Sequence, residues 1–181
     1  MILLTLSLWT SLTGFSSHES PNLTHEISPN VAFYNGDALR TTTLGGISYV
    51  FHFNQTFWFG TDVQGGKISV DRSNGMNLKA GDKFFAANGA VYWNLPAVLG
   101  DYKDGKGFYS DLYTAIGAGN LWIAKKKEPF GLIGGGLLIH FPISYLALRF
   151  DLKALFFKLE NSQGGDMNFD SVLSIGPSFL F

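Results

Sequence analysis

The stretch LALRFDLKALFF, from Leu146 to Phe157, contains the pattern that decides the fold. Arg149, Asp151 and Lys153 occupy every second position, and only Leu, Phe and Ala stand between and around them. Successive side chains of a β-strand point to opposite faces, so this pattern predicts a strand with one charged face and one apolar face. The two faces need different surroundings.

Composition narrows what those surroundings are. The 181 residues suffice for one domain, and they include 46% hydrophobic residues, only 15% charged residues and 22 glycines. This balance is more apolar than that of ordinary soluble domains. The net charge of −1 gives no reason to expect a nucleic-acid partner, and the absence of cysteine excludes disulfides, thiol catalysis and Cys-based metal sites.

The first residues differ from the rest of the chain. Residues 1–16 form an apolar run followed by small residues, which resembles a secretory signal peptide, although no Lys or Arg precedes the run. We expect cleavage after Ser16, a short N-terminal periplasmic segment at residues 17–24, and a barrel over residues 25–181.

Alternation of period two recurs along the chain and predicts eight strands in all. The window 130–148 is apolar enough to imitate a transmembrane helix, but three consecutive glycines and Pro142 favour two strands joined at residues 142–144. The predicted strands lie within residues 25–34, 42–53, 56–65, 84–95, 110–123, the two halves of the 130–157 region, and 168–181.

The connections between these strands differ in length and polarity. Those at residues 54–55 and 142–144 are tight, whereas polar loops are expected after the first, third, fifth and seventh strands. Short turns at one rim and longer loops at the other are typical of an outer-membrane barrel. The long connector at 96–107 is an exception, and the longest loop, 65–83, is predicted to be the main surface-exposed interaction element.

Two eight-stranded architectures fit this pattern: a soluble barrel with a ligand inside, and a membrane barrel with the faces exchanged. The face that is not apolar consists largely of Gly, Ala, Asn and Tyr with scattered charges, which suits a narrow packed lumen better than a solvated exterior. We therefore predict an all-β, eight-stranded antiparallel up-and-down transmembrane β-barrel of the bacterial outer membrane. The expected polar network of its lumen comprises Asp62, Asp111, Arg149, Asp151, Lys153 and Asp170.

The C-terminal segment supports the same assignment. Apolar residues alternate from Leu173 to the terminal Phe, which resembles the signal that the barrel assembly machinery recognises; we assign that role to Phe179 and Phe181. Together with LGGISYVFHFNQTFWFGTDVQGG, DLYTAIGAGNLWI and LALRFDLK, this strand resembles the outer-membrane β-barrel domain proteins of myxobacteria and related predatory bacteria. The resemblance implies a small barrel, and it brings no catalytic residue.

Candidate chemical groups are few. His52 and His140 are expected at the same rim, where they would suggest a metal or acid–base site, but no third ligand stands at a suitable spacing. We predict no catalytic residue, metal or cofactor. Lys125, Lys126 and Lys127 are expected in an outer loop, either in contact with lipopolysaccharide phosphates or as a solvated basic tip.

The sequence therefore predicts a non-enzymatic envelope component, either structural or binding partners through its outer loops. A narrow pore and a lipid-modifying outer-membrane enzyme are the alternatives. The expected partners are outer-membrane lipid, lipopolysaccharide and the barrel assembly machinery, with a protein partner at the outer loops as a further option. The expected state is a monomer.

Overall fold

The computed structural model describes residues 24–36, 41–54, 56–68, 80–95, 108–123, 126–159 and 166–181. Its regular elements are strands, and no helix among the described residues is long and apolar enough to cross a membrane. The strands are β1 (His25–Asn35), β2 (Thr42–His52), β3 (Phe57–Lys67), β4 (Lys83–Leu95), β5 (Tyr109–Ile123), β6 (Lys126–His140), β7 (Leu146–Leu159) and β8 (Asp166–Leu180).

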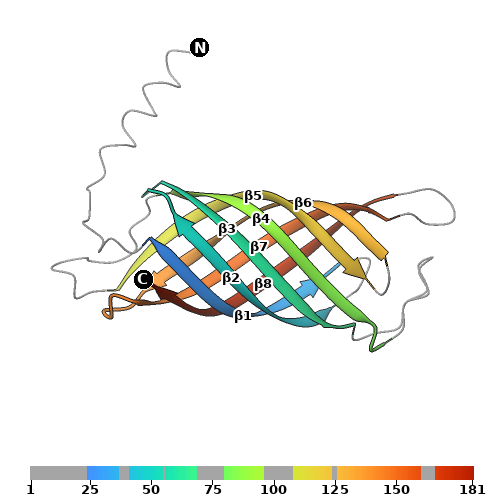
Figure 1. Cartoon of the computed structure of the whole chain (residues 1–181), viewed down its shortest axis with the longest axis horizontal. Helices are drawn as coiled ribbons and strands as arrows, with labels where there is room; N and C mark the ends of the chain where they lie inside the picture. Colours follow the sequence, from blue (N-terminus) through green and yellow to red (C-terminus); the bar gives the residue numbers. More distant parts are fainter. Residues whose placement is uncertain are drawn as a thin grey trace, which may run out of the picture.

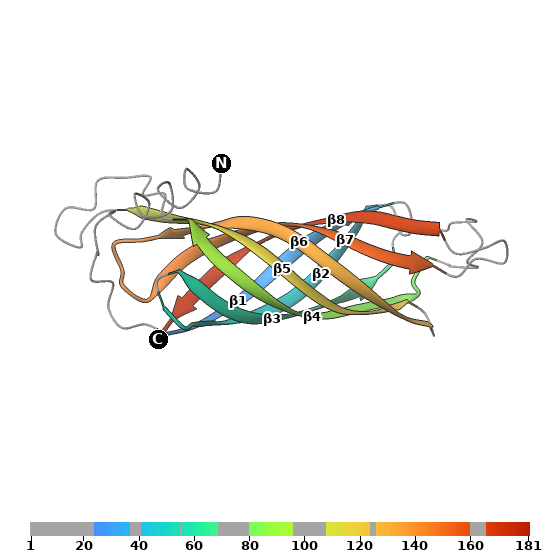
Figure 2. The same ribbon diagram turned by 90° about the horizontal axis from the view of Figure 1, so that it is seen from above.

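The eight strands form one closed antiparallel barrel. Each strand pairs with the next along the chain, and β1 pairs with β8 to close the ring. The strands run obliquely around the long axis, with the C-terminus at one end (Figures 1 and 2). The fold class predicted from the alternation of side chains is confirmed.

The register of the strands fixes the size of the barrel. The chain of paired residues that starts at His25 passes through each strand in turn and returns to β1 at Asn35, ten residues further along. Such a stagger tilts the strands against the barrel axis, and eight tilted strands enclose just enough room for side chains.

Side chains alternate between lumen and exterior as the sequence predicts. In β7, Arg149, Asp151 and Lys153 are 2–4% exposed, whereas Leu152 is 59% exposed. Outward positions of the other strands likewise carry large exposed apolar side chains, among them Ile47, Phe59, Ile116, Ile133 and Leu173. A barrel with charges inside and a belt of apolar side chains outside has the faces of a membrane barrel.

The barrel has two rims. The C-terminal rim contains Phe181 and the connections at 53–56, 96–108 and 141–145, and the loop rim contains those at 36–41, 68–82, 124–125 and 160–165. The expected loop after the fifth strand is wrong, because Lys126, Lys127, Glu128 and Pro129 belong to β6. The expected signal peptide, most of the 65–83 loop, most of the 96–107 connector, and Lys125 lie outside the described residues.

Candidate functional site

A cluster of buried charged groups lies in the lumen toward the C-terminal rim, and Arg149 is at its centre. Its Nη1 donates to Oε1 of Glu26 at 2.8 Å, and its Nε donates to Oδ2 of Asp151 at 3.0 Å. The guanidinium also stacks over the rings of Tyr92 and Tyr113, 5.0 and 4.7 Å from their centroids. Arg149 is thus held on its edges by two carboxylates and on its faces by two aromatic rings.

Lys153, the other lumen cation of β7, has a separate acidic partner. Its Nζ donates to Oδ2 of Asp62 on β3 at 3.0 Å. The remaining acceptor positions of Asp62 receive Ser48 Oγ at 2.9 Å and Gln64 Nε2 at 3.0 Å. Further hydrogen bonds to the carboxylate offset part of the cost of burying an ion pair, and Asp62 receives them here.

Glu26 is the lumen residue that the sequence analysis missed. Its side chain is fully buried and accepts hydrogen bonds from Arg149, from Ser28 and Ser178, and from Nε2 of His52 at 3.0 Å. The sequence did contain an indication of this position. Glu26 and Ser28 are two residues apart in β1, so both side chains point to the inward face of the strand. We call Glu26, Asp62, Arg149, Asp151, Lys153 and His52 the charge network.

Two of the expected network members take other partners. Asp111 bonds His140 Nε2 at 2.9 Å, and Asp170 accepts a hydrogen bond from the hydroxyl of Tyr34. The expectation that they neutralise Arg149 and Lys153 is therefore corrected. Register explains the difference: Asp111 lies near the C-terminal end of the lumen and Asp170 near the loop end, while the β7 cations lie between them.

The two histidines do not form a shared site. His52 and His140 both end strands at the C-terminal rim, but each pairs with its own carboxylate, on Glu26 and Asp111 respectively. No group of three His, Cys, Asp or Glu side chains suited to a metal ion occurs among the described residues. The two histidines are thus held in separate pairs at the same rim.

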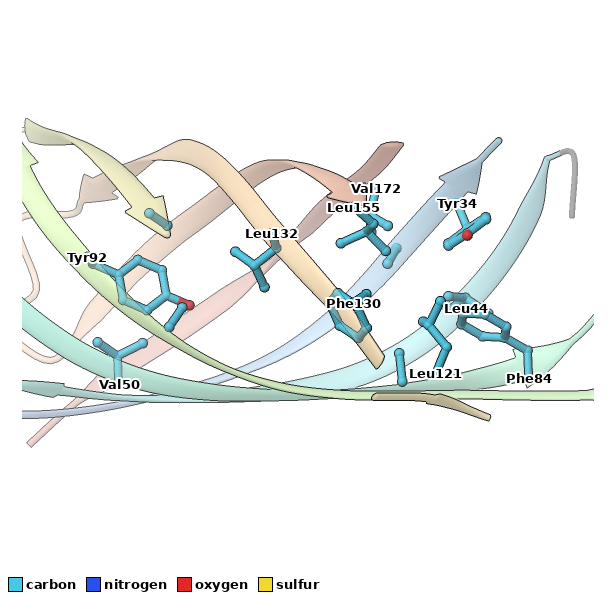
Figure 3. Close-up of a cluster of buried hydrophobic side chains, with 14 of the residues drawn as sticks. Tyr34, Leu44, Val50, Phe84, Tyr92, Leu121, Phe130, Leu132, Leu155 and Val172 are labelled. Carbon is cyan, nitrogen blue, oxygen red and sulfur yellow. The ribbon is translucent and has the colours of Figure 1, made fainter. Parts of the chain in front are cut away.

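The other half of the lumen, toward the loop rim, is filled by apolar side chains. Figure 3 shows Leu44, Phe84, Leu121 and Phe130 together at one end of the lumen, with Tyr92 toward the other. We call the apolar plug the set of buried residues Leu44, Phe84, Leu121, Phe130, Leu155 and Phe157. The lumen is therefore closed at two levels, by paired charges toward the C-terminal rim and by packed apolar side chains toward the loop rim.

Aromatic side chains gather at both ends of the exterior. Phe57 stacks on Trp93 at the C-terminal end, and Phe85 packs on Trp122 at the loop end, as the aromatic girdles of membrane barrels do. Trp58 and Tyr92 are not part of these girdles, because both lie buried in the lumen.

The basic residues at the loop rim have a defined geometry. Lys126 and Lys127 are both exposed at the start of β6, and the Nζ of Lys127 lies 5.6 Å from the centre of the Trp122 ring. Lys127 is therefore a cation next to an exterior aromatic side chain at the end of the apolar belt.

The residues assigned to the assembly signal close the barrel. Phe179 is 43% and Phe181 is 57% exposed. The backbone of Phe181 exchanges two hydrogen bonds with His25, at 3.0 and 2.9 Å, and their rings stack at 5.6 Å. The end of the chain is thus joined to the first residue of β1.

Comparison with known proteins supports the fold. No protein-family model matches the chain, and a search of curated proteins finds no relative. Among solved structures, Neisserial surface protein A has a TM-score of 0.50 at 12% identity, covering 88% of this chain and 97% of that one.

Two further structures have lower TM-scores. The N-terminal β-barrel domain of Pseudomonas aeruginosa OprF scores 0.48 at 11% identity, covering 85% and 97%, and Ail of Yersinia pestis, its attachment invasion locus protein, scores 0.43 at 12%, covering 87% and 97%. The narrower resemblance to proteins of predatory bacteria is not supported. The chain has the fold of small eight-stranded outer-membrane barrels.

Proposed function

We propose that the chain is a non-enzymatic component of a bacterial outer membrane, whose barrel serves as a rigid scaffold and whose loops and lipid-facing exterior make its functional contacts. One observation carries this proposal: buried side chains occupy the lumen at two levels, those of the charge network toward the C-terminal rim and those of the apolar plug toward the loop rim. A filled lumen leaves the surfaces outside it to do the binding.

The same observation argues against the two alternatives. A narrow pore would have to pass both Arg149, clamped between Glu26 and Asp151, and the packed side chains around Phe130. A lipid-modifying enzyme of this kind needs a nucleophile or a base near the outer leaflet, at the loop rim, whereas the two candidate histidines end β2 and β6 at the C-terminal rim. Nothing among the described residues favours either alternative.

The exterior of the loop rim supplies the first candidate contact. Lys127 beside Trp122 places a positive charge where the apolar belt ends, the level at which lipid phosphates lie. We propose that Lys126 and Lys127, with Lys125 next to them in sequence, contact lipopolysaccharide phosphates, and that the connection between β3 and β4, within the 65–83 region, forms the principal binding loop.

A deletion strain complemented with variants tests the proposal. We expect loss of the chain to raise sensitivity to detergents or to abolish surface attachment, and the full-length chain to restore the phenotype. A variant with residues 69–79 replaced by a short Gly/Ser linker separates the two roles, because only a structural role survives the replacement. A change in lipid A or phospholipid mass on deletion, restored by the chain, would instead establish an enzyme and overturn the proposal.

A further inference from the structure

Two lysines lie directly opposite each other on the outer face of the barrel, at the loop rim. Lys67 ends β3 and Lys83 begins β4, and the two are register partners with exposed side chains. The pairing continues beyond them, because Ile68 N donates to the carbonyl of Asp82 at 2.9 Å and Gly81 N donates to the carbonyl of Ile68 at 2.8 Å. The backbone therefore holds Lys67 and Lys83 side by side.

Two lysines in this arrangement repel each other unless an anion lies between them. Directly opposed residues have Cβ atoms about 4.5–5.5 Å apart, and like charges at that separation destabilise a sheet. Among the described residues, no carboxylate forms an ion pair with Lys67 or Lys83, whereas the lumen cations Arg149 and Lys153 both have one. The Lys67–Lys83 pair thus has the form of a site for an anion from outside the chain.

The level of the pair in the membrane indicates which anion it meets. Lys83 and Phe85 are two positions apart on the outward face of β4, and the Phe85 ring packs on Trp122 with their centroids 5.2 Å apart. Exterior aromatic side chains of this kind mark the end of the apolar belt, where the phosphates of lipid headgroups lie. The anion that reaches Lys67 and Lys83 at this level is therefore a lipid phosphate.

The same aromatic pair leads to a second cationic position. Trp122 is the register partner of Phe85 on one side and of Lys127 on the other, and Lys127 Nζ lies 5.6 Å from the centre of the Trp122 ring. Lys127 is on β6, two strands away from Lys83, which places the two positions on the order of 10 Å apart across the sheet. One phosphate bound at the lysine pair leaves Lys127, over Trp122, without an anion.

We propose that this face binds a single lipid headgroup through two phosphates, one held by Lys67 and Lys83 and the other by Lys127 with Lys126. The ligand that fits is a glycolipid phosphorylated at both ends of its sugar headgroup, the chemistry of the lipid A anchor of lipopolysaccharide. A phospholipid with one phosphate fills only one of the two positions. The inference rests on the lipopolysaccharide contact proposed above, and it adds Lys67 and Lys83 to that contact.

Titration of the purified full-length chain in zwitterionic detergent tests the two-phosphate site. The probes are lipid A and monophosphoryl lipid A, which differ by one phosphate. We expect the unmodified chain to bind lipid A roughly tenfold more tightly, because each lysine near a headgroup phosphate adds to the attraction. The double variant with Lys67→Gln and Lys83→Gln should lose that preference and should change little in its affinity for monophosphoryl lipid A.

A pair of single variants controls for the general positive charge of the rim. Lys158 is also exposed at the loop end of its strand, but its register partner is Met167 instead of a second lysine. Lys83→Gln should therefore weaken lipid A binding more than Lys158→Gln does. Equal losses from the two variants, or equal affinity of the unmodified chain for the two lipids, would overturn the two-phosphate site. Displacement of bound lipid A by an equal concentration of inorganic phosphate would overturn it in favour of a soluble anion.

Stability gives a second measurement that does not depend on the binding titration. In detergent without lipid, Lys83→Gln removes a like-charge contact with Lys67, so the urea midpoint of unfolding should rise. With lipid A in excess the same variant loses part of the stabilisation by the ligand, so its midpoint should fall below that of the unmodified chain. A shift of the same sign in both conditions would contradict the proposal.

Failure of this inference differs from failure of the proposed lipopolysaccharide contact. An unmodified chain that binds neither form of lipid A would refute the contact itself. A chain that binds both forms with equal affinity would refute only the second phosphate position at Lys67 and Lys83.

Discussion

The two halves of the lumen are closed by different interactions, ion pairs in one and apolar packing in the other, and β7 contributes to both. Arg149, Asp151 and Lys153 of β7 belong to the charge network. The next two inward positions of the same strand, Leu155 and Phe157, belong to the apolar plug. Paired charges fix a geometry, because each group needs its specific partner, whereas a packed apolar region needs volume and tolerates exchange. The two halves should therefore respond differently to the same kind of truncation.

The largest effect is expected in the charge network. Arg149→Met leaves Glu26 and Asp151 buried without their cation and should cost about 3–5 kcal/mol of unfolding free energy. Urea unfolding in lipid vesicles measures it. The triple variant with Glu26→Gln and Asp151→Asn should recover most of the loss, and equal destabilisation of the single and triple variants would show that the charges are not coupled.

A comparable truncation in the apolar plug should lower the unfolding free energy slightly less. Restoring the lost volume, rather than a specific partner, should recover the stability. Leu155→Ala opens a cavity and is expected to lower the unfolding free energy by about 2–5 kcal/mol. Leu155→Met keeps the volume and should cost less than about 1.5 kcal/mol. If Leu155→Met were as damaging as Leu155→Ala, the plug would be specified by shape as tightly as the charge network.

A charge placed on the exterior tests the assignment of the faces. Phe150 lies between Arg149 and Asp151 in β7 and points outward, so Phe150→Arg should cost about 2–4 kcal/mol and reduce insertion into the membrane. Phe150→Leu is the control and should insert normally. Normal insertion and heat-modifiable migration on gels for Phe150→Arg would mean that the two faces were exchanged.

The smallest effect is expected at the loop rim. Lys127→Gln removes one exposed cation near Trp122 and should change the unfolding free energy by less than about 1 kcal/mol. Binding to vesicles containing lipopolysaccharide should nevertheless weaken, and more so at low salt. Unchanged binding would show that Lys127 is only a solvated charge and does not contact lipopolysaccharide.

The sequence alone was sufficient to predict a strand and the direction of its side chains where the two faces of that strand meet different surroundings. The alternation around Arg149 predicts the strand, its parity and its charged inner face, because lipid and lumen impose opposite demands. The pattern fails at Lys126 to Pro129, where β6 is polar on both faces near the rim, so period two disappears and the segment looks like a loop.

Contacts across the lumen were beyond the sequence for a different reason. Glu26 and Arg149 are separated by 123 positions and meet only because β8 joins β1 to β7 in the closed ring. Parity places both residues inside, but it does not give their height along the barrel. That height depends on the ten-residue stagger, and the stagger determines that Arg149 bonds Glu26 while Asp111 bonds His140.

Planar-bilayer recording tests the central claim, that the lumen is closed at two levels, most directly. The intact chain should show no steady channel, and Phe130→Ala, which thins only the apolar plug, should show none either because the charge network still blocks the lumen. A large, reproducible conductance from the unmodified chain would contradict the claim and would establish a pore in place of a scaffold.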